Sequence, residues 1–204
     1  MATTHENVLQ ETFWNADESQ IWLKRAVLIV AGIATLTIAA KIRIPMWPVP
    51  GTLQTMIILL IGSSYGLRLG VTTVLAYLVL GAIGLNVFTG SSAESYGLAY
   101  MAGPTGGYLV GFLVAAAAMG ALARKGWDRT WQKMALSMLV GTAIIYAFGL
   151  TWMSHLFLAD KGAAWVVKYG ITNFLVFDAI KLAIAAMVTP MLWKMVRGGD
   201  QGAS

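Results

Sequence analysis

Six long apolar segments dominate this sequence, and they restrict the folds that the chain can adopt. They are Arg25–Ala40, Leu53–Leu67, Leu69–Phe88, Gly107–Ala123, Met134–Leu158 and Trp165–Val196. Only 11% of the 204 residues are charged, whereas a soluble domain carries roughly 25%. So few charges cannot cover a water-facing surface, and the surplus apolar surface must face lipid. Backbone N–H and C=O groups must be paired inside each segment in lipid, so the segments are predicted to be helices.

We therefore expect an all-α fold, an integral membrane bundle of six transmembrane helices. The bundle is assigned to residues 24–197, with tails at residues 1–23 and 198–204. Some segments are shorter than the roughly 20 residues of a typical span, as buried core helices also are. We interpret them as spans because the chain has no polar layer that could bury them. The first tail holds four acids and lacks the basic stretch and apolar core of a signal peptide, so we interpret it as cytoplasmic.

Basic residues are distributed unevenly between the expected connections, which indicates an orientation. With the N-terminus inside, nine Lys and Arg residues fall on the inner side and four on the outer side. The inner set is Lys24, Arg25, Arg68, Arg124, Lys125, Arg129, Lys133, Lys194 and Arg197, and the outer set is Lys41, Arg43, Lys161 and Lys168. Because cytoplasmic connections carry the excess of positive charge, both termini are predicted to be cytoplasmic. The chain is then a multi-pass protein of the cytoplasmic (inner) membrane.

The residue types present argue against an enzyme, a metal centre or a nucleotide site. The chain has no cysteine and only two histidines, so the usual nitrogen and sulfur ligands of zinc are scarce. The run GPTGG at residues 103–107 lacks the GxxxxGK[ST] spacing of a phosphate loop. His155, Asp160 and Ser154 are the one candidate hydrolytic set, and no nucleophile-elbow motif accompanies them. We expect no catalytic residue, metal or cofactor, and any ATP-driven step requires a separate protein.

Two opposite charges lie inside the sixth apolar segment. Asp178 and Lys181 are three residues apart, so they share one face of a helix. Charges inside a membrane span are costly and mark a functional site that faces the bundle interior. A pair that offers donors and acceptors suits a polar ligand such as a urea or an amide. The alternative is a structural ion pair that only locks two helices together.

Two connections on the expected outer face contain further candidate ligand residues. The ranges Arg43–Gln54 and Thr89–Gly107 are rich in proline, glycine and aromatic residues, unlike a charged, solvated linker. Gln54 can both donate and accept hydrogen bonds, either to a ligand or to local backbone at a helix start. Trp47 and Tyr100 either wall a pocket or are ordinary aromatics of the membrane interface.

Small residues recur every four positions in the first apolar segment, at Ala31, Thr35 and Ala39. Such rows allow two helices to approach closely. From the spacing alone, the row faces either another span of this chain or a partner protein.

Four motifs together resemble the BioY family, the biotin-binding S components of energy-coupling factor (ECF) vitamin transporters. They are IPMWPVPGTLQT at residues 44–55, LGAIGLNVFTG at 80–90, GPTGGYLVGF at 103–112 and the Asp178–Lys181 pair. The resemblance implies a six-helix biotin-binding domain with a vitamin pocket near the outer face, capped by loops. It implies high-affinity biotin capture for uptake, in partnership with a membrane coupling protein and two ATPases, or through self-association in a solitary form. The rival interpretation is a ligand-free structural or assembly protein.

The resemblance also assigns roles to individual residues. Gln54 matches a glutamine expected to contact ligand, and Asp178 and Lys181 match the acid and lysine expected to bind the biotin head group. Asn86 stands where the family usually has proline, and it either bonds the ligand or loosens a helix end. The small-residue row described above is expected to contact the coupling protein.

The partner of the biotin carboxylate is the open point of the resemblance. Some family members use an arginine near the connection after the third span. This chain has no Lys or Arg between Arg68 and Arg124. The remaining candidates are backbone N–H groups, Tyr100 and Lys181.

Overall fold

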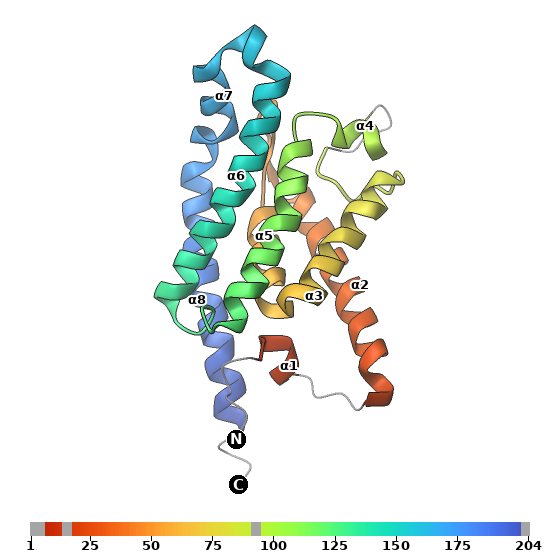
Figure 1. The fold of residues 1–204 in the computed structure, drawn as a ribbon, viewed down its shortest axis with the longest axis vertical. Coiled ribbons are helices and arrows are strands. Elements are labelled where there is room, and N and C mark those ends of the chain that lie inside the picture. Colours follow the sequence, from red (N-terminus) through yellow and green to blue (C-terminus); the bar gives the residue numbers. More distant parts are fainter. Residues whose placement is uncertain (1–6, 14–17, 91–94, 201–204) are drawn as a thin grey trace.

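The structure is a computed structural model that describes residues 7–13, 18–90 and 95–200. Helices form nearly all of it (Figure 1). They are α1 (Leu9–Phe13), α2 (Ile21–Lys41), α3 (Gln54–Ala82), α4 (Gly97–Met101), α5 (Gly106–Arg124), α6 (Trp131–Lys161), α7 (Ala163–Gly170) and α8 (Leu175–Asp200). Two short 3₁₀ helices, η1 (Glu18–Gln20) and η2 (Thr172–Phe174), precede α2 and α8. The all-α prediction misses one small feature, an antiparallel pair of two-residue strands, β1 (Arg43–Ile44) and β2 (Gly51–Thr52).

Five helical stretches among the described residues are long and apolar enough to cross a membrane. They are Ile21–Lys41, Gln54–Ala82, Gly106–Arg124, Trp131–Lys161 and Ala163–Met195. The prediction of an apolar, multi-pass helical bundle is therefore confirmed. The fifth stretch contains the break between α7 and α8 and the second contains a sharp turn, so neither is one straight rod.

The second stretch, α3, is two helical halves that fold back on each other. Gly66 lies between them with φ 78° and ψ 179°, a backbone conformation open to glycine and costly for other residues. A Cβ atom on Gly70 would lie only 3.2 Å from the Cα atom of Gly62, although residues eight apart in a continuous helix are about 12 Å apart. The two halves correspond to the second and third predicted segments, and the turn between them lies at Gly66 rather than at Arg68.

Close helix contacts hold the middle of the bundle together. Helix α5 packs between α3 and α6, as Figure 1 shows. A Cβ atom on Gly62 would lie 2.7 Å from the carbonyl oxygen of Ala116. A Cβ atom on Gly120 would collide with the backbone nitrogen of Leu67 at the turn of α3. Small residues at helix contacts let backbones approach closely, which is how apolar helices associate in lipid.

The last predicted segment, Trp165–Val196, is interrupted in the structure. Helix α7 ends at Gly170, η2 follows, and α8 begins at Leu175 and continues through Pro190. The hydroxyl of Tyr108 on α5 donates to the carbonyl oxygen of Gly170 at 2.8 Å. This bond satisfies a backbone group that the break leaves without a helical partner. The break also brings Phe174 into the interior, one turn before Asp178.

The bundle has two distinct ends (Figure 1). The upper end carries the β1–β2 ribbon, α4 and the connection between α6 and α7. The lower end carries α1, the start of α2, the turn of α3 and the end of α8. At that end the indole N–H of Trp193 donates to Asp128 at 2.6 Å, which joins α8 to the α5–α6 connection.

Enlarging Gly120 should destabilise the bundle. Gly120→Leu places a side chain against the backbone of Leu67, and overpacking of this kind typically costs about 1–3 kcal/mol. Ala121→Leu is the matched control, because Ala121 is exposed on the same helix. Thermal unfolding of the purified proteins in one detergent should show a lower midpoint for Gly120→Leu only. Equal midpoints for the two variants would show that the contact between α5 and the turn of α3 has room for a larger side chain at Gly120.

Candidate ligand-binding site

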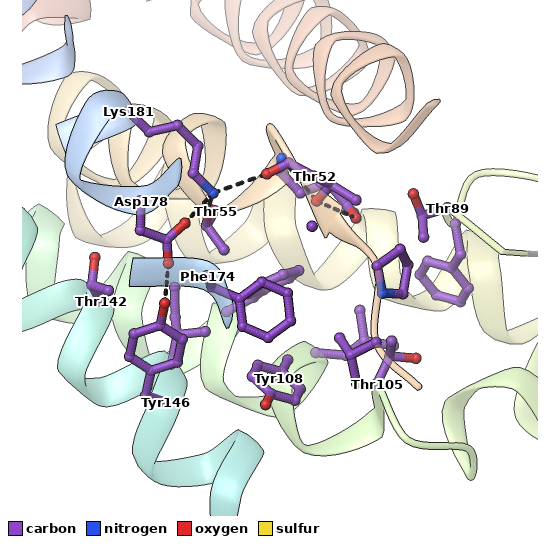
Figure 2. A pocket seen from close by; sticks show the side chains of 18 of the residues that line it. Thr52, Thr55, Thr89, Thr105, Tyr108, Thr142, Tyr146, Phe174, Asp178 and Lys181 are labelled. Atoms are coloured by element: carbon purple, nitrogen blue, oxygen red, sulfur yellow. Dashed lines mark hydrogen bonds and ion pairs between the residues drawn. The ribbon is translucent and has the colours of Figure 1, made fainter. Parts of the chain in front are cut away.

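A cavity opens within the upper half of the bundle, between α3, α5, α6 and α8 (Figure 2). It encloses about 610 Å³ of space between atoms, counting the part that opens to solvent. Its wall includes four of the residues predicted from the sequence: Gln54, Tyr100, Asp178 and Lys181. The loop that ends at β2 and the residue before α5 complete the wall.

The ion pair of Asp178 and Lys181 is the polar centre of the cavity. The two side chains contact each other directly, and Lys181 is only 4% exposed. The Lys181 ammonium also donates to the carbonyl oxygen of Thr52 at 2.9 Å and to the hydroxyl of Thr55. The hydroxyl of Tyr146 on α6 donates to the second oxygen of Asp178. Figure 2 shows these four contacts as one continuous network.

The network leaves its two charged members with different capacities for a ligand. An ammonium group has three donors, and Asp178, Thr52 and Thr55 take up all three from Lys181. A carboxylate has about four acceptor sites, and Asp178 accepts one bond at each oxygen from a protein group. Asp178 can therefore accept further hydrogen bonds without rearrangement, whereas Lys181 must exchange a partner before it can donate to a ligand.

Gln54 is fixed at the start of α3 by its own hydrogen bonds. Its side-chain amide donates to the hydroxyl of Tyr77 at 2.7 Å, and its side-chain oxygen accepts from Thr52 at 3.3 Å. The Tyr77 hydroxyl in turn donates to the carbonyl oxygen of Val87 at 2.9 Å. Gln54 thus joins the two halves of α3 to the segment that follows them. One amide hydrogen and one oxygen lone pair remain for another partner, so the local and the ligand interpretations are compatible.

Aromatic rings form the apolar part of the wall. Phe88 stacks on Tyr100 with ring centroids 5.1 Å apart, and it meets Tyr77 edge to face at 5.5 Å. Tyr108 and Phe174 line the cavity from α5 and η2 (Figure 2). A mostly apolar wall with a few convergent polar groups is the usual composition of a small-molecule site.

Two predicted ligand residues lie outside this wall. The side chain of Trp47 is on the surface, 66% exposed, with its ring edge to face with Trp165 at 5.7 Å. Asn86 is exposed, and its side-chain oxygen accepts from the ammonium of Lys41 at 2.7 Å. The same ammonium donates to the carbonyl oxygen of Phe88 at 2.6 Å. Asn86 is thus linked to the cavity wall indirectly, because Lys41 contacts both Asn86 and the carbonyl group of Phe88.

A second, outer cavity of about 790 Å³ adjoins the first and shares Pro50, Tyr100 and Thr105 with it. Arg43 lines this vestibule, and its guanidinium donates to the carbonyl oxygen of Thr89 at 2.9 Å. Among the described residues, Arg43 and Lys181 are the only basic side chains in the walls of the two cavities. A positive group therefore lies at each end of the combined space.

The other predicted groups are placed as follows. On α2, Ala31 and Thr35 are exposed and Ala39 is buried, so the small-residue row turns from the surface into the bundle. His155 is exposed on α6, and its ring lies 5.7 Å from that of Trp152. In the part of the chain that the structure describes, no group of three or more His, Cys, Asp or Glu could hold a metal ion.

Sequence reasoning missed several residues of the site. Tyr146 has no motif and lies inside an apolar run, yet it contacts Asp178. Thr52 and Thr55 flank Gln54 in the TLQT motif, so their place beside the site was open to inference. Tyr108 belongs to the GPTGGYLVGF motif, but no local pattern there separates a tyrosine of the cavity wall from an ordinary core residue.

Comparison with known proteins agrees with this geometry. Residues 9–198 match the BioY family. A biotin transporter BioY of Thermotoga maritima is 38% identical over 170 residues, which cover 82% of this chain and 96% of the relative. A probable biotin transporter BioY of Pyrococcus horikoshii is 33% identical, with coverage of 83% and 96%.

A solved structure is also similar, the crystal structure of the S-component for biotin from an ECF-type ABC transporter. It superposes with a TM-score of 0.71 at 26% identity, covering 88% of this chain and 95% of that chain. The family match spans nearly all of the described bundle, and the cavity residues lie within it. This chain belongs to the BioY family.

Proposed function

We propose that this chain captures biotin from outside the cell for uptake across the cytoplasmic membrane and is itself no enzyme. The observation that carries the proposal is the buried Asp178–Lys181 pair in the wall of a small-molecule cavity. Relatives at 38% and 33% identity are named as biotin transporters, which supports biotin as the ligand. The rival, a ligand-free helix lock, leaves the cavity beside the pair without a purpose.

The head group of biotin suits the polar centre of the cavity. Its ureido ring offers two N–H donors and one carbonyl acceptor. Asp178 takes the N–H donors with the acceptor sites that it has in excess. Lys181 holds Asp178 in place through their ion pair, and it donates to the ureido oxygen by releasing Thr55 or Thr52. Gln54 and Tyr100 contact the ligand from the neighbouring wall.

The vestibule gives the biotin carboxylate a partner. Biotin carries this group at the end of a flexible aliphatic chain, so a head group beside Asp178 directs the tail toward the cavity mouth. Arg43 lies in the adjoining vestibule, and a guanidinium binds a carboxylate through two parallel hydrogen bonds. Asn86 acts indirectly by holding Lys41, whereas Trp47 shields the outer side of the loop.

The topology and partners follow from the same assignment. Six spans arise from α2, the two halves of α3, α5, α6 and α8, within the domain of residues 24–197. The lower end of the bundle and both tails face the cytoplasm. The small-residue row of α2 contacts a membrane coupling protein that acts with two ATPases, or a second copy of this chain in a solitary form. Ala31 and Thr35 are the exposed residues of this row, and Ala39 is its buried end.

Neutralising either member of the ion pair should weaken biotin binding. A hydrogen bond to a charged partner is worth about 1.5–3 kcal/mol, so Asp178→Asn and Lys181→Met should each bind about 10- to 150-fold more weakly. Isothermal titration and thermal unfolding are measured on the same purified samples. Asp160→Asn, which changes an exposed acid at the end of α6, is the matched control. If the variants lose stability yet bind biotin as the parent does, the pair is a helix lock.

The role of Arg43 is tested with a ligand that lacks the tail charge. Arg43 is exposed, and exposed ion pairs are worth up to about 1 kcal/mol. Arg43→Gln should therefore bind biotin about 5-fold more weakly and bind biotin methyl ester as the parent does. Lys161→Gln, another basic residue of the upper end, should change neither affinity. Equal losses for biotin and its ester would remove Arg43 from the carboxylate site and leave biotin binding itself unchallenged.

The orientation is tested with single cysteines, because the chain has none of its own. Tyr96→Cys and Gln132→Cys change exposed residues, the first at the upper end and the second in the first turn of α6 at the lower end. An impermeant maleimide should label the first variant in intact cells and the second only after permeabilisation. The reverse pattern would overturn the assignment.

A further inference from the structure

A second charged groove lies at the lower end of the bundle, far from the biotin cavity. It encloses about 1,120 Å³ of space between atoms, counting its open side. Its wall includes four basic side chains from three helices, namely Lys24, Arg25, Arg68 and Arg124, against one acid, Glu11. The α2 start, the α3 turn and the α5 end thus direct positive charge toward one space.

Helix α1 forms one wall of this groove. The ammonium of Lys24 donates to the carbonyl oxygen of Gln10 at 2.9 Å, and Arg124 forms an ion pair with Glu11 at 3.0 Å. Val8, at the start of this segment, is fully buried against the turn of α3. In Figure 1, α1 lies below the bundle, between the lower ends of α2 and α8. Two of the four cations therefore anchor α1.

The other two cations are differently placed. Arg25 and Arg68 are exposed, and neither has a hydrogen bond or ion pair from its side chain to any residue that the structure describes. Both side chains line the same groove. A guanidinium matches the geometry of a phosphate group through paired hydrogen bonds. This pair supplies a two-arginine site for one phosphate.

Three apolar residues complete this part of the wall, beside the polar groups of Gln10, Tyr65 and Thr72, and the apolar surface continues along α2. Ile21, Ile29 and Leu69 line the groove beside the arginines. Next to them on α2, Trp22 and Val30 are exposed at 67% and 66%. Arginines at the end of a membrane span, followed by an apolar helix face, match a molecule with a phosphate head and hydrocarbon chains. A free phosphate ion would contact only the arginines and leave the apolar helix face uncovered.

We propose that this groove binds an anionic phospholipid of the inner leaflet, a site separate from biotin capture. Arg25 and Arg68 hold the lipid phosphate, while the acyl chains run along Trp22 and Ile29, on a different face of α2 from Ala31 and Thr35. Basic pockets between transmembrane helices on the cytoplasmic side bind acidic lipid head groups in this way. The lipid also bridges α2 and the turn of α3, so its binding stabilises the lower end.

The test compares phosphatidylglycerol with phosphatidylcholine, which has the same phosphate and chains but no net charge. Full-length protein in detergent is titrated with each lipid, and bound lipid is counted by native mass spectrometry. Each arginine near an anionic surface contributes about 1 kcal/mol, so the double variant Arg25→Gln, Arg68→Gln should bind phosphatidylglycerol about 30-fold more weakly. The parent should prefer phosphatidylglycerol and unfold at a higher temperature in its presence.

Two controls make the result decisive. Lys125→Gln with Lys133→Gln removes two exposed basic residues of the same end that do not line the groove, and it should bind lipid as the parent does. Biotin titration of every variant checks the fold. Equal losses in both double variants would indicate diffuse attraction and overturn the site. Competition by inorganic phosphate or glycerol phosphate at similar concentrations would overturn the lipid as occupant, as would equal binding of the two lipids by the parent.

Discussion

The buried charge of Lys181 is the constraint on which the upper half of this protein depends. The residue is 4% exposed, and an uncompensated ion in such a place costs several kcal/mol. Its three donors are met by α8, by the end of the β2 loop and by α3, through Asp178, Thr52 and Thr55. Satisfying this one cation therefore joins α8 to the stretch from β2 to the start of α3, which is far away in the chain. It also places Gln54, between the two threonines, at the cavity wall.

The lower half is built on a different principle, the close approach of backbones. Gly62 lies against Ala116, and Gly120 lies against the turn of α3, so α3 and α5 meet with no side chain between them. Above these contacts, large rings such as those of Phe88 and Tyr108 line the cavity. The cavity thus lies directly above the close contacts between α3 and α5. A rigid base beneath a cavity limits the ways in which the ligand residues can shift.

Much of the fold follows from composition and spacing, because apolar length and the cost of unpaired backbone in lipid leave helices as the one solution. The sequence predicts the turn of α3 at Arg68, two residues after its observed position at Gly66. Either residue can end a helix, and no local pattern shows which one does. At the site, the shared face of Asp178 and Lys181 follows from their spacing of three. The contact with Tyr146 joins α6 to α8, and no local pattern encodes which apolar faces meet.

The role of each basic side chain depends on the groups that it contacts. The basic excess that indicates orientation is not uniform, because Lys24 and Arg124 hold α1 whereas Arg25 and Arg68 are directed into an open groove. At the other end, Arg43 and Lys41 hold the carbonyl groups of the cavity wall. Topology rules require only a count of charges at each end. The orientation rule does not fix where the charges lie within each end, so individual basic residues can also take part in binding.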